Sequence, residues 1–286
     1  MKKIKGMILN DSWTYFQQKG WRFLDDDGEF RPWINAAKRN IVRKFKNKQY
    51  EMGQLRSGST WFVGINFLDN GPKGDIKGVP FSSKIQSDIR RQFGSLIEFW
   101  DQGQVSIFWP GYPRRDLTET LNSFKYRVKK YASHVDGLIP TGNKRRRFAR
   151  EFHAFILGIP IINSTSHSAP IIVWEGSHLI FRDLFKTLYS GLSEFEVNNL
   201  DITEIYQECR RKVFSTCSAS IVCCDKNRPY ILDRHLLHGV LPWVDATRNL
   251  SVTSDTPRSE IDPLAGRAVI YFRPQYEHKL DWVFEN

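Results

Sequence analysis

Long apolar segments are missing from this sequence of 286 residues. Its longest largely apolar run, residues 154–162, has nine residues and contains Gly158 and Pro160. A membrane-spanning helix needs about 20 such residues, so the sequence predicts no membrane association. The apolar part of the N-terminal segment, residues 6–9, is shorter than the roughly 7–15 residues of a secretory signal. We therefore expect a cytoplasmic protein.

Cysteine is also scarce, with only Cys209, Cys217, Cys223 and Cys224 in the chain. None of these residues forms a CxxC pair, which argues against a zinc site, and their small number suits a reduced intracellular protein. Hydrophobic residues make up 41% of the sequence and aromatic residues 14%, which excludes a disordered chain and a disulfide-stabilised miniprotein.

Acidic residues are fewer than basic ones, 31 against 42, and the net charge is +11. A basic surface attracts nucleic acid, anionic membranes or anionic small molecules. A nucleic-acid-binding protein is one alternative, but no helix-turn-helix, zinc-finger or RRM-type motif supports it, so we expect no nucleic-acid partner. One basic run is either a solvated loop or an attractor of an anionic substrate; it contains Lys144, Arg145, Arg146 and Arg147.

The hydrophobic pattern predicts many short strands and a few helices. An amphipathic helix is expected over residues 32–52, with Pro32 in its first turn and Gly53 at its end. Further helices are expected over residues 84–100, 179–191 and 201–214. Strands are expected over residues 61–67, 105–109, 124–134, 153–162, 170–174, 218–224, 230–238 and 267–272. This pattern indicates a mainly β fold, a jelly-roll or other double-sheet barrel with helices packed outside.

Three polar residues in two segments have the pattern of a metal site. His134 and Asp136 are two positions apart, so in an extended strand they project from the same face. His238 follows about a hundred residues later, at the end of a predicted strand. Two histidines and one carboxylate form the facial triad of non-haem Fe(II) oxygenases, which leaves positions open for a co-substrate and O₂. The alternative is that the histidines pack in the core, which we favour for His235.

An arginine begins the apolar strand over residues 267–272, where a buried cation needs an anion. Arg267 offers a planar, bidentate grip on a carboxylate. Arg267, Val269, Tyr271 and Arg273 share one face of the strand, so either arginine could face a cofactor. Arg273 stands before Pro274, and a strand-end arginine that extends to solvent is the alternative there.

Taken together, four segments resemble the Fe(II)/2-oxoglutarate-dependent oxygenases, and in particular the phytanoyl-CoA dioxygenase-like family. Residues 134–137 (HVDG) resemble the family's HxDG motif, and residues 170–178 (PIIVWEGSH) resemble its GSH turn. Residues 237–243 (LHGVLPW) resemble the segment of the last metal ligand, and residues 267–274 (RAVIYFRP) the strand of the 2-oxoglutarate arginine. The four segments occur in the family's order and lie within residues 100–275.

The resemblance implies a double-stranded β-helix in one domain, residues 1–286, in which residues 1–100 elaborate a core over residues 100–275. It implies that His134, Asp136 and His238 bind Fe(II) and that Arg267 binds the distal carboxylate of 2-oxoglutarate. The implied reaction uses O₂, converts 2-oxoglutarate to succinate and CO₂, and hydroxylates a small organic substrate. Asp136 favours hydroxylation over halogenation, because related halogenases have a small residue at that position. His178, in the GSH turn, is expected to be structural.

One departure from the family concerns the arginine. Arg267 follows His238 by 29 residues, whereas in many relatives the spacing is about ten, which Arg248 would match. We prefer Arg267 because the strand after it matches better, and we interpret residues 249–265 as part of an insertion; Arg273 is the third candidate. A metal-binding, cupin-like protein that does not use 2-oxoglutarate is the alternative enzyme.

Overall fold

The computed structural model describes residues 12–25, 28–94, 98–223, 228–244 and 261–285. In this part of the chain the strands form a large sheet, a small sheet and a hairpin, and every strand pair is antiparallel. The large sheet has the order β1-β10-β7-β12-β4-β3-β2. Its strands are β1 (Trp21–Phe23), β10 (Tyr230–Asp233), β7 (Phe155–Pro160), β12 (Arg267–Phe272), β4 (Gln104–Phe108), β3 (Trp61–Gly64) and β2 (Leu55–Arg56).

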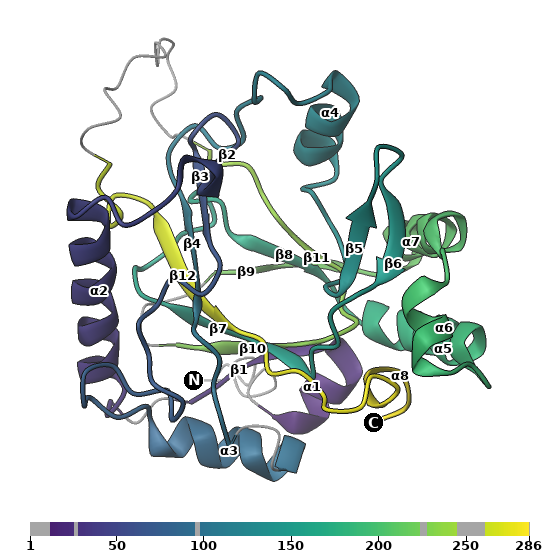
Figure 1. The fold of residues 1–286 in the computed structure, drawn as a ribbon, viewed down its shortest axis with the longest axis horizontal. Helices are drawn as coiled ribbons and strands as arrows, with labels where there is room; N and C mark the ends of the chain where they lie inside the picture. Colours follow the sequence, from purple (N-terminus) through teal and green to yellow (C-terminus); the bar gives the residue numbers. More distant parts are fainter. Residues whose placement is uncertain (1–11, 26–27, 95–97, 224–227, 245–260, 286) are drawn as a thin grey trace, which may run out of the picture.

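The small sheet has the order β11-β8-β9 and faces the large one (Figure 1). Its strands are β11 (His238–Val240), β8 (Ile171–Trp174) and β9 (Ala219–Val222), and His134 adds a short bridge to His238 at the β11 edge. From β4 onward the chain alternates between the sheets: β4, then His134, β7, then β8 and β9, β10, β11 and β12. This alternation is the topology of a double-stranded β-helix, as the sequence predicts.

Alternate residues of the strands face the space between the sheets. Ile156 and Val269 of the large sheet pack there against Ile171 and Val173 of the small sheet. The intervening residues face outward, and Ile270 packs in a second cluster that covers the opposite face of the large sheet. Because side chains alternate along a strand, every second residue packs in the interior and the residues between them pack on the outer faces.

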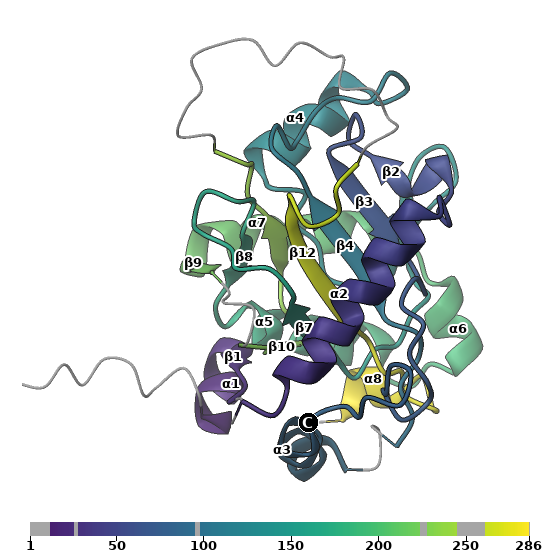
Figure 2. The same ribbon diagram turned by 90° about the vertical axis from the view of Figure 1, so that its left-hand side faces the viewer.

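Helices cover the outer faces (Figures 1 and 2). The helix α2 (Arg31–Lys46) crosses the large sheet and buries Trp33, Ile34 and Ile41 against it. The small sheet is covered by α5 (Ser177–Tyr189) and α7 (Thr203–Thr216), whose Phe181 and Val213 pack with Trp174. The remaining elements are α1 (Trp13–Lys19), η2 (Met52–Gln54), α3 (Ser83–Phe93), α4 (Leu121–Lys129), β5 (Leu138–Thr141), β6 (Arg146–Ala149), α6 (Glu194–Asn199) and α8 (Asp281–Phe284).

Four predicted elements differ from the structure, and one of them is the helix expected over residues 84–100, which ends at Phe93. Residues 124–134, expected to be a strand, mostly belong to helix α4, because the Thr120 side chain accepts a hydrogen bond from Ser123 N and caps a helix that lies outside both sheets. The strand expected over residues 230–238 is two strands, since a turn at Asp233 moves the chain from one sheet to the other. The helix expected to end at Gly53 ends at Lys46, where Asn47 caps it.

None of the helices in the described segments is both long enough and apolar enough to cross a membrane.

Candidate metal centre

The backbone brings His134, Asp136 and His238 to one place. His134 and His238 exchange two backbone hydrogen bonds, with N···O distances of 2.9 and 3.1 Å. Val135 points the opposite way, into the cluster beneath helix α7, and its N–H donates to the Tyr206 hydroxyl at 3.1 Å. His134 and Asp136 therefore project together from one side of the extended segment, as their spacing predicts.

Each of these three side chains offers one ligand atom, and the three atoms lie within 4.8 Å of one another. Asp136 Oδ1 is 3.0 Å from His134 Nε2 and 3.6 Å from His238 Nε2. The Asp136 and His238 side chains are almost buried, whereas the His134 side chain is 43% exposed, so solvent reaches the cluster from the His134 side. The arrangement is an open cluster of two imidazole nitrogens and one carboxylate oxygen.

Both imidazoles are oriented by the backbone. His134 Nδ1 lies 2.9 Å from the Ala132 carbonyl oxygen, and His238 Nδ1 lies 2.9 Å from the Leu236 carbonyl oxygen. A carbonyl oxygen only accepts, so Nδ1 carries the proton in both neutral rings and Nε2 keeps its lone pair. A backbone carbonyl behind the second ring nitrogen is the usual support of a metal-binding histidine.

Two glycines allow the strands of the site to approach. A Cβ on Gly239 would lie 2.5 Å from the Tyr131 carbonyl oxygen, so only glycine fits after His238 at this distance. Gly137 has φ +87°, and a Cβ there would lie 2.3 Å from the Glu151 carbonyl oxygen. Close backbone contacts thus explain why glycine stands at these two positions of the HVDG and LHG segments, next to the three candidate ligands.

The second carboxylate oxygen of Asp136 faces an arginine. Arg273 Nε lies 3.0 Å from Asp136 Oδ2, and Arg273 Nη1 donates to Gln104 Oε1 at 2.6 Å. Burial by itself would raise the pKa of Asp136, but the Arg273 guanidinium beside it holds this pKa well below its usual value. Asp136 is therefore a carboxylate with one oxygen directed at the histidines and the other at Arg273.

Burial also affects His238. It lowers the pKa of this imidazole to about 4, although the nearby Asp136 acts in the opposite direction. The ring is consequently neutral at pH 7 and needs to lose no proton before it binds a metal ion.

Arg267 is the first residue of β12, at the opposite end of the strand from Arg273, and it is 1% exposed. Its Nη2 donates to the Tyr271 hydroxyl at 3.4 Å, and its guanidinium carbon is 5.5 Å from the centre of the Phe108 ring. Tyr271 belongs to the cluster between the sheets, and its hydroxyl accepts a hydrogen bond from Tyr230 at 3.1 Å. Arg267 thus faces the barrel interior. Arg248 lies outside the described residues.

Other residues that the sequence singled out have structural surroundings. His178 is buried, and its Nε2 lies 3.0 Å from the Gln17 carbonyl oxygen, which joins the GSH turn to α1. His235 is fully buried, and its ring contacts the rings of Phe185 and Trp282.

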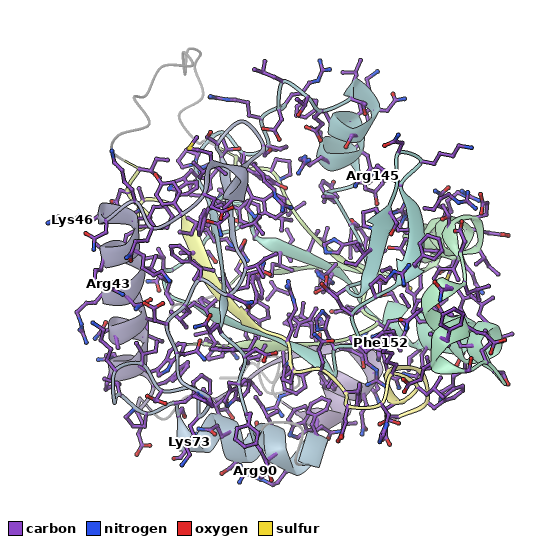
Figure 3. All side chains as sticks on the ribbon, in the orientation of Figure 1. Arg43, Lys46, Lys73, Arg90, Arg145 and Phe152 are labelled. Carbon is purple, nitrogen blue, oxygen red and sulfur yellow. The ribbon has the colours of Figure 1, made fainter. Side chains whose placement is uncertain are left out.

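The basic run lies at the turn of the hairpin formed by β5 and β6 and at the start of β6, with Arg145 in the turn (Figure 3). Arg146 is held by Asp201 and Glu204, and Arg147 donates to the Leu138 carbonyl oxygen at 2.8 Å. Lys144 and Arg145 are the exposed members of the run.

The sequence left Arg273 either as a candidate for 2-oxoglutarate or as a strand-end arginine that extends to solvent, and gave no connection with Asp136. The signal was nevertheless present, because Arg273 shares a strand face with Arg267, and that face turns inward. The direction of the face follows from Val269 and Tyr271, which are apolar or aromatic and stand between the two arginines.

The sequence matches no protein-family model, and it matches no curated protein. Several solved structures are similar in fold. One is the non-heme alpha ketoglutarate dependent carbocyclase SnoK from nogalamycin biosynthesis, with TM-score 0.47, 9% identity, and coverage of 92% of this chain and 86% of that one. A second is EctD from S. alaskensis with 2-oxoglutarate and 5-hydroxyectoine, with TM-score 0.40, 12% identity, and coverage of 93% and 79%.

A third is HygX from Streptomyces hygroscopicus with nickel, 2-oxoglutarate and hygromycin B bound, with TM-score 0.41, 12% identity, and coverage of 90% and 83%. These likenesses are distant. The fold assignment therefore stands on the strand order of this chain, and the candidate metal site stands on its own distances.

Proposed function

We propose that this protein is an Fe(II)/2-oxoglutarate-dependent dioxygenase, related to the phytanoyl-CoA dioxygenase-like family, that hydroxylates a small organic substrate. The observation that supports it most is the cluster of His134, Asp136 and His238 on adjacent segments at the edge of the small sheet. The donor set fits iron, since two imidazole nitrogens and one carboxylate oxygen suit Fe(II) and leave coordination positions for a co-substrate and O₂.

In this proposal His134 Nε2, His238 Nε2 and one oxygen of Asp136 hold the metal ion. When bound, Fe(II) would activate O₂, one oxygen atom of which goes to succinate as 2-oxoglutarate loses CO₂ and the other to the C–H bond of the substrate. Asp136 is kept ionised by Arg273, so a carboxylate is ready to bind the metal at neutral pH. The presence of this carboxylate favours hydroxylation over halogenation.

Arg267 is the residue that we propose for the distal carboxylate of 2-oxoglutarate. It is buried at the other end of the strand that carries Arg273, and both face the inside of the barrel. A guanidinium group in an apolar, aromatic environment binds a carboxylate strongly, because little water competes for its donors. The nearby rings of Phe108 and Tyr271 keep water away from that end.

The test is the formation of succinate from 2-oxoglutarate by protein loaded with Fe(II) without oxygen and then exposed to O₂. We expect succinate from the natural chain and none from His134→Ala or Arg267→Ala. The matched control is His167→Ala, which removes an exposed histidine away from the cluster and should leave succinate formation unchanged.

If the protein forms no succinate, Fe(II) and 2-oxoglutarate binding should be measured separately. Binding of Fe(II) without 2-oxoglutarate would favour a cupin-like metal protein. Binding of neither would contradict the proposal.

A further inference from the structure

A second site lies outside the barrel, between α4 and α7. It is a pocket of about 370 Å³, lined by Tyr126, Lys130, Gln207, Arg210, Arg211 and Phe214. Three of these six residues are cationic and none is acidic. The absence of an acidic residue distinguishes it from an ordinary solvated surface with mixed charges.

The pocket is separate from the space between the sheets. Helix α7 packs on the outer face of the small sheet, where Phe214 contacts the Trp174 ring edge-on at 5.0 Å. The neighbouring residue Val173 faces the barrel interior instead. One hydrogen bond connects the pocket with the candidate metal ligands. The Tyr126 hydroxyl donates to the carbonyl oxygen of Ser133 at 2.7 Å, and Ser133 directly precedes His134.

The cations of the pocket rest on aromatic rings. Lys130 Nζ lies 4.5 Å from the centre of the Phe214 ring, and the Arg210 guanidinium lies 4.8 Å from the centre of the Tyr126 ring. Among the described residues, no carboxylate lies within 4.0 Å of the charged nitrogens of Lys130, Arg210 or Arg211. An aromatic ring orients a cation without cancelling its charge, so the positive potential of the pocket remains.

Other basic positions of the chain are different. Arg146, on the adjacent strand β6, is held by Asp201 and Glu204. Arg43 and Lys44 of α2 both contact Asp69 at 2.7 Å. Carboxylates thus neutralise the positive charges at these places, whereas the positive charges between α4 and α7 are available to an anionic ligand.

A further cation lies close to the pocket. Burial lowers the pKa of Arg147, and Arg145 and Arg210 lower it further, while Tyr206 and Tyr126 act in the opposite direction. The positive charges here are close enough to act on one another, and a bound anion would relieve this repulsion.

We propose that this pocket binds the phosphate group of a small phosphate monoester. The dianionic phosphate would lie among Lys130, Arg210 and Arg211, where guanidinium groups match its oxygens with paired donors. The volume exceeds what a phosphate group alone fills, and the Phe214 ring and the Gln207 amide are available to the organic part. The inference does not depend on the proposed dioxygenase activity, because the pocket shares no lining residue with the metal cluster.

The experiment is calorimetric titration of the metal-free full chain with phenyl phosphate and, separately, with inorganic phosphate, both at low ionic strength. Phenyl phosphate is the probe because it joins the dianion to a ring. We expect one molecule to bind per chain, several-fold more tightly than inorganic phosphate. Equal affinity for the two would show that the pocket recognises the phosphate group alone and not the organic part, and would contradict the monoester proposal.

The variants Arg211→Gln and Lys130→Gln locate the site. Each should weaken phenyl phosphate binding about tenfold, the usual effect of losing one charge-assisted hydrogen bond of about 1.4 kcal/mol. The control is Lys212→Gln, which makes the same change of net charge at an exposed position of α7 that does not line the pocket. It should change the affinity less than twofold. Equal losses in all three variants, or no binding by the natural chain, would overturn the proposal.

Discussion

Strand β12 carries an arginine at one end and another immediately beyond its other end, and the two have different surroundings. Arg273 contacts the carboxylate of Asp136 at 3.0 Å and the amide of Gln104 at 2.6 Å, and its side chain is 25% exposed. Arg267 is 1% exposed and lies among aromatic rings and tyrosine hydroxyls. The surroundings of the two arginines therefore differ: Arg273 neutralises a carboxylate of the chain, whereas Arg267 is the residue that we propose for the carboxylate of 2-oxoglutarate.

The two ends of β12 therefore accept different charges. At the Arg273 end the guanidinium is already matched by Asp136, and the pair together directs one carboxylate oxygen toward the histidines. At the Arg267 end, a bound dicarboxylate would be dehydrated by the surrounding rings and would be held more strongly than at a surface. Substitutions at the two ends should therefore have different effects on metal binding and on 2-oxoglutarate binding.

Arg267→Ala should remove nearly all 2-oxoglutarate binding without removing metal binding. Two charge-assisted hydrogen bonds of about 2 kcal/mol each correspond to a loss of about 1000-fold in affinity. The measurement is anaerobic titration of the Fe(II)-loaded protein with 2-oxoglutarate, accompanied by direct Fe(II) binding. Arg267→Lys, which keeps the charge but not the paired donors, should recover part of the affinity. A folded Arg267→Ala protein with natural affinity for 2-oxoglutarate would contradict the assignment.

The buried imidazole of His238 should make the free energy of unfolding of the metal-free chain depend on pH in the acid range. His238 has a folded pKa of about 4, whereas an unfolded histidine has about 6.5. Between these values the unfolded chain binds more protons, so the free energy of unfolding decreases as the pH falls from 6.5 to 4, by about 3 kcal/mol in total. His238→Asn should have a shallower dependence in this window than the natural chain, measured by urea unfolding with a chelator present. The exposed control His167→Asn should keep the natural dependence, and an unchanged slope in His238→Asn would refute the expectation.

Arg273→Gln should weaken metal binding and change 2-oxoglutarate binding much less. The variant leaves the buried Asp136 without its cation, so its pKa rises and its carboxylate is no longer oriented. Loss of a group that supports a metal ligand usually costs about 10- to 100-fold in metal affinity. The measurement is Fe(II) affinity as a function of pH, and the loss should be greater at pH 5 than at pH 7. Arg273→Lys should restore most of the affinity, and equal losses of 2-oxoglutarate and metal binding would remove the distinction between the two ends.

The local sequence pattern was sufficient to predict that His134 and Asp136 project together, but it was insufficient to predict the contact of Asp136 with Arg273. The two-residue spacing of His134 and Asp136 determines that both project to one side, and the glycines after Asp136 and His238 mark close backbone contacts. The Asp136–Arg273 contact joins positions 137 residues apart and depends on how β12 is aligned with the segment that carries Asp136. That alignment comes from the packing of two sheets, which a single strand's pattern does not contain.

The same contrast explains the error at α4. Residues 124–134 contain Phe124, Tyr126 and Val128 in alternation, which is the pattern of a half-buried strand. Thr120 caps a helix over residues 121–129 instead. Within the predicted strand, His134 forms a β-bridge to His238, and His134 is also a candidate metal ligand.

The smallest effect is expected for substitutions of Gln104, which supports Asp136 only indirectly, through its hydrogen bond with Arg273. Gln104→Ala removes the 2.6 Å hydrogen bond to Arg273 Nη1 but leaves the Arg273–Asp136 ion pair. One hydrogen bond to a charged, partly exposed group corresponds to about 1 kcal/mol, so Fe(II) affinity should fall about fivefold at most. Gln104→Glu is the informative partner variant: its carboxylate competes with Asp136 for Arg273 and should weaken Fe(II) binding more at pH 5 than Gln104→Ala does. If both variants bind Fe(II) as the natural chain does, then Arg273 is positioned by β12 alone, and the support of the metal ligand ends at the arginine.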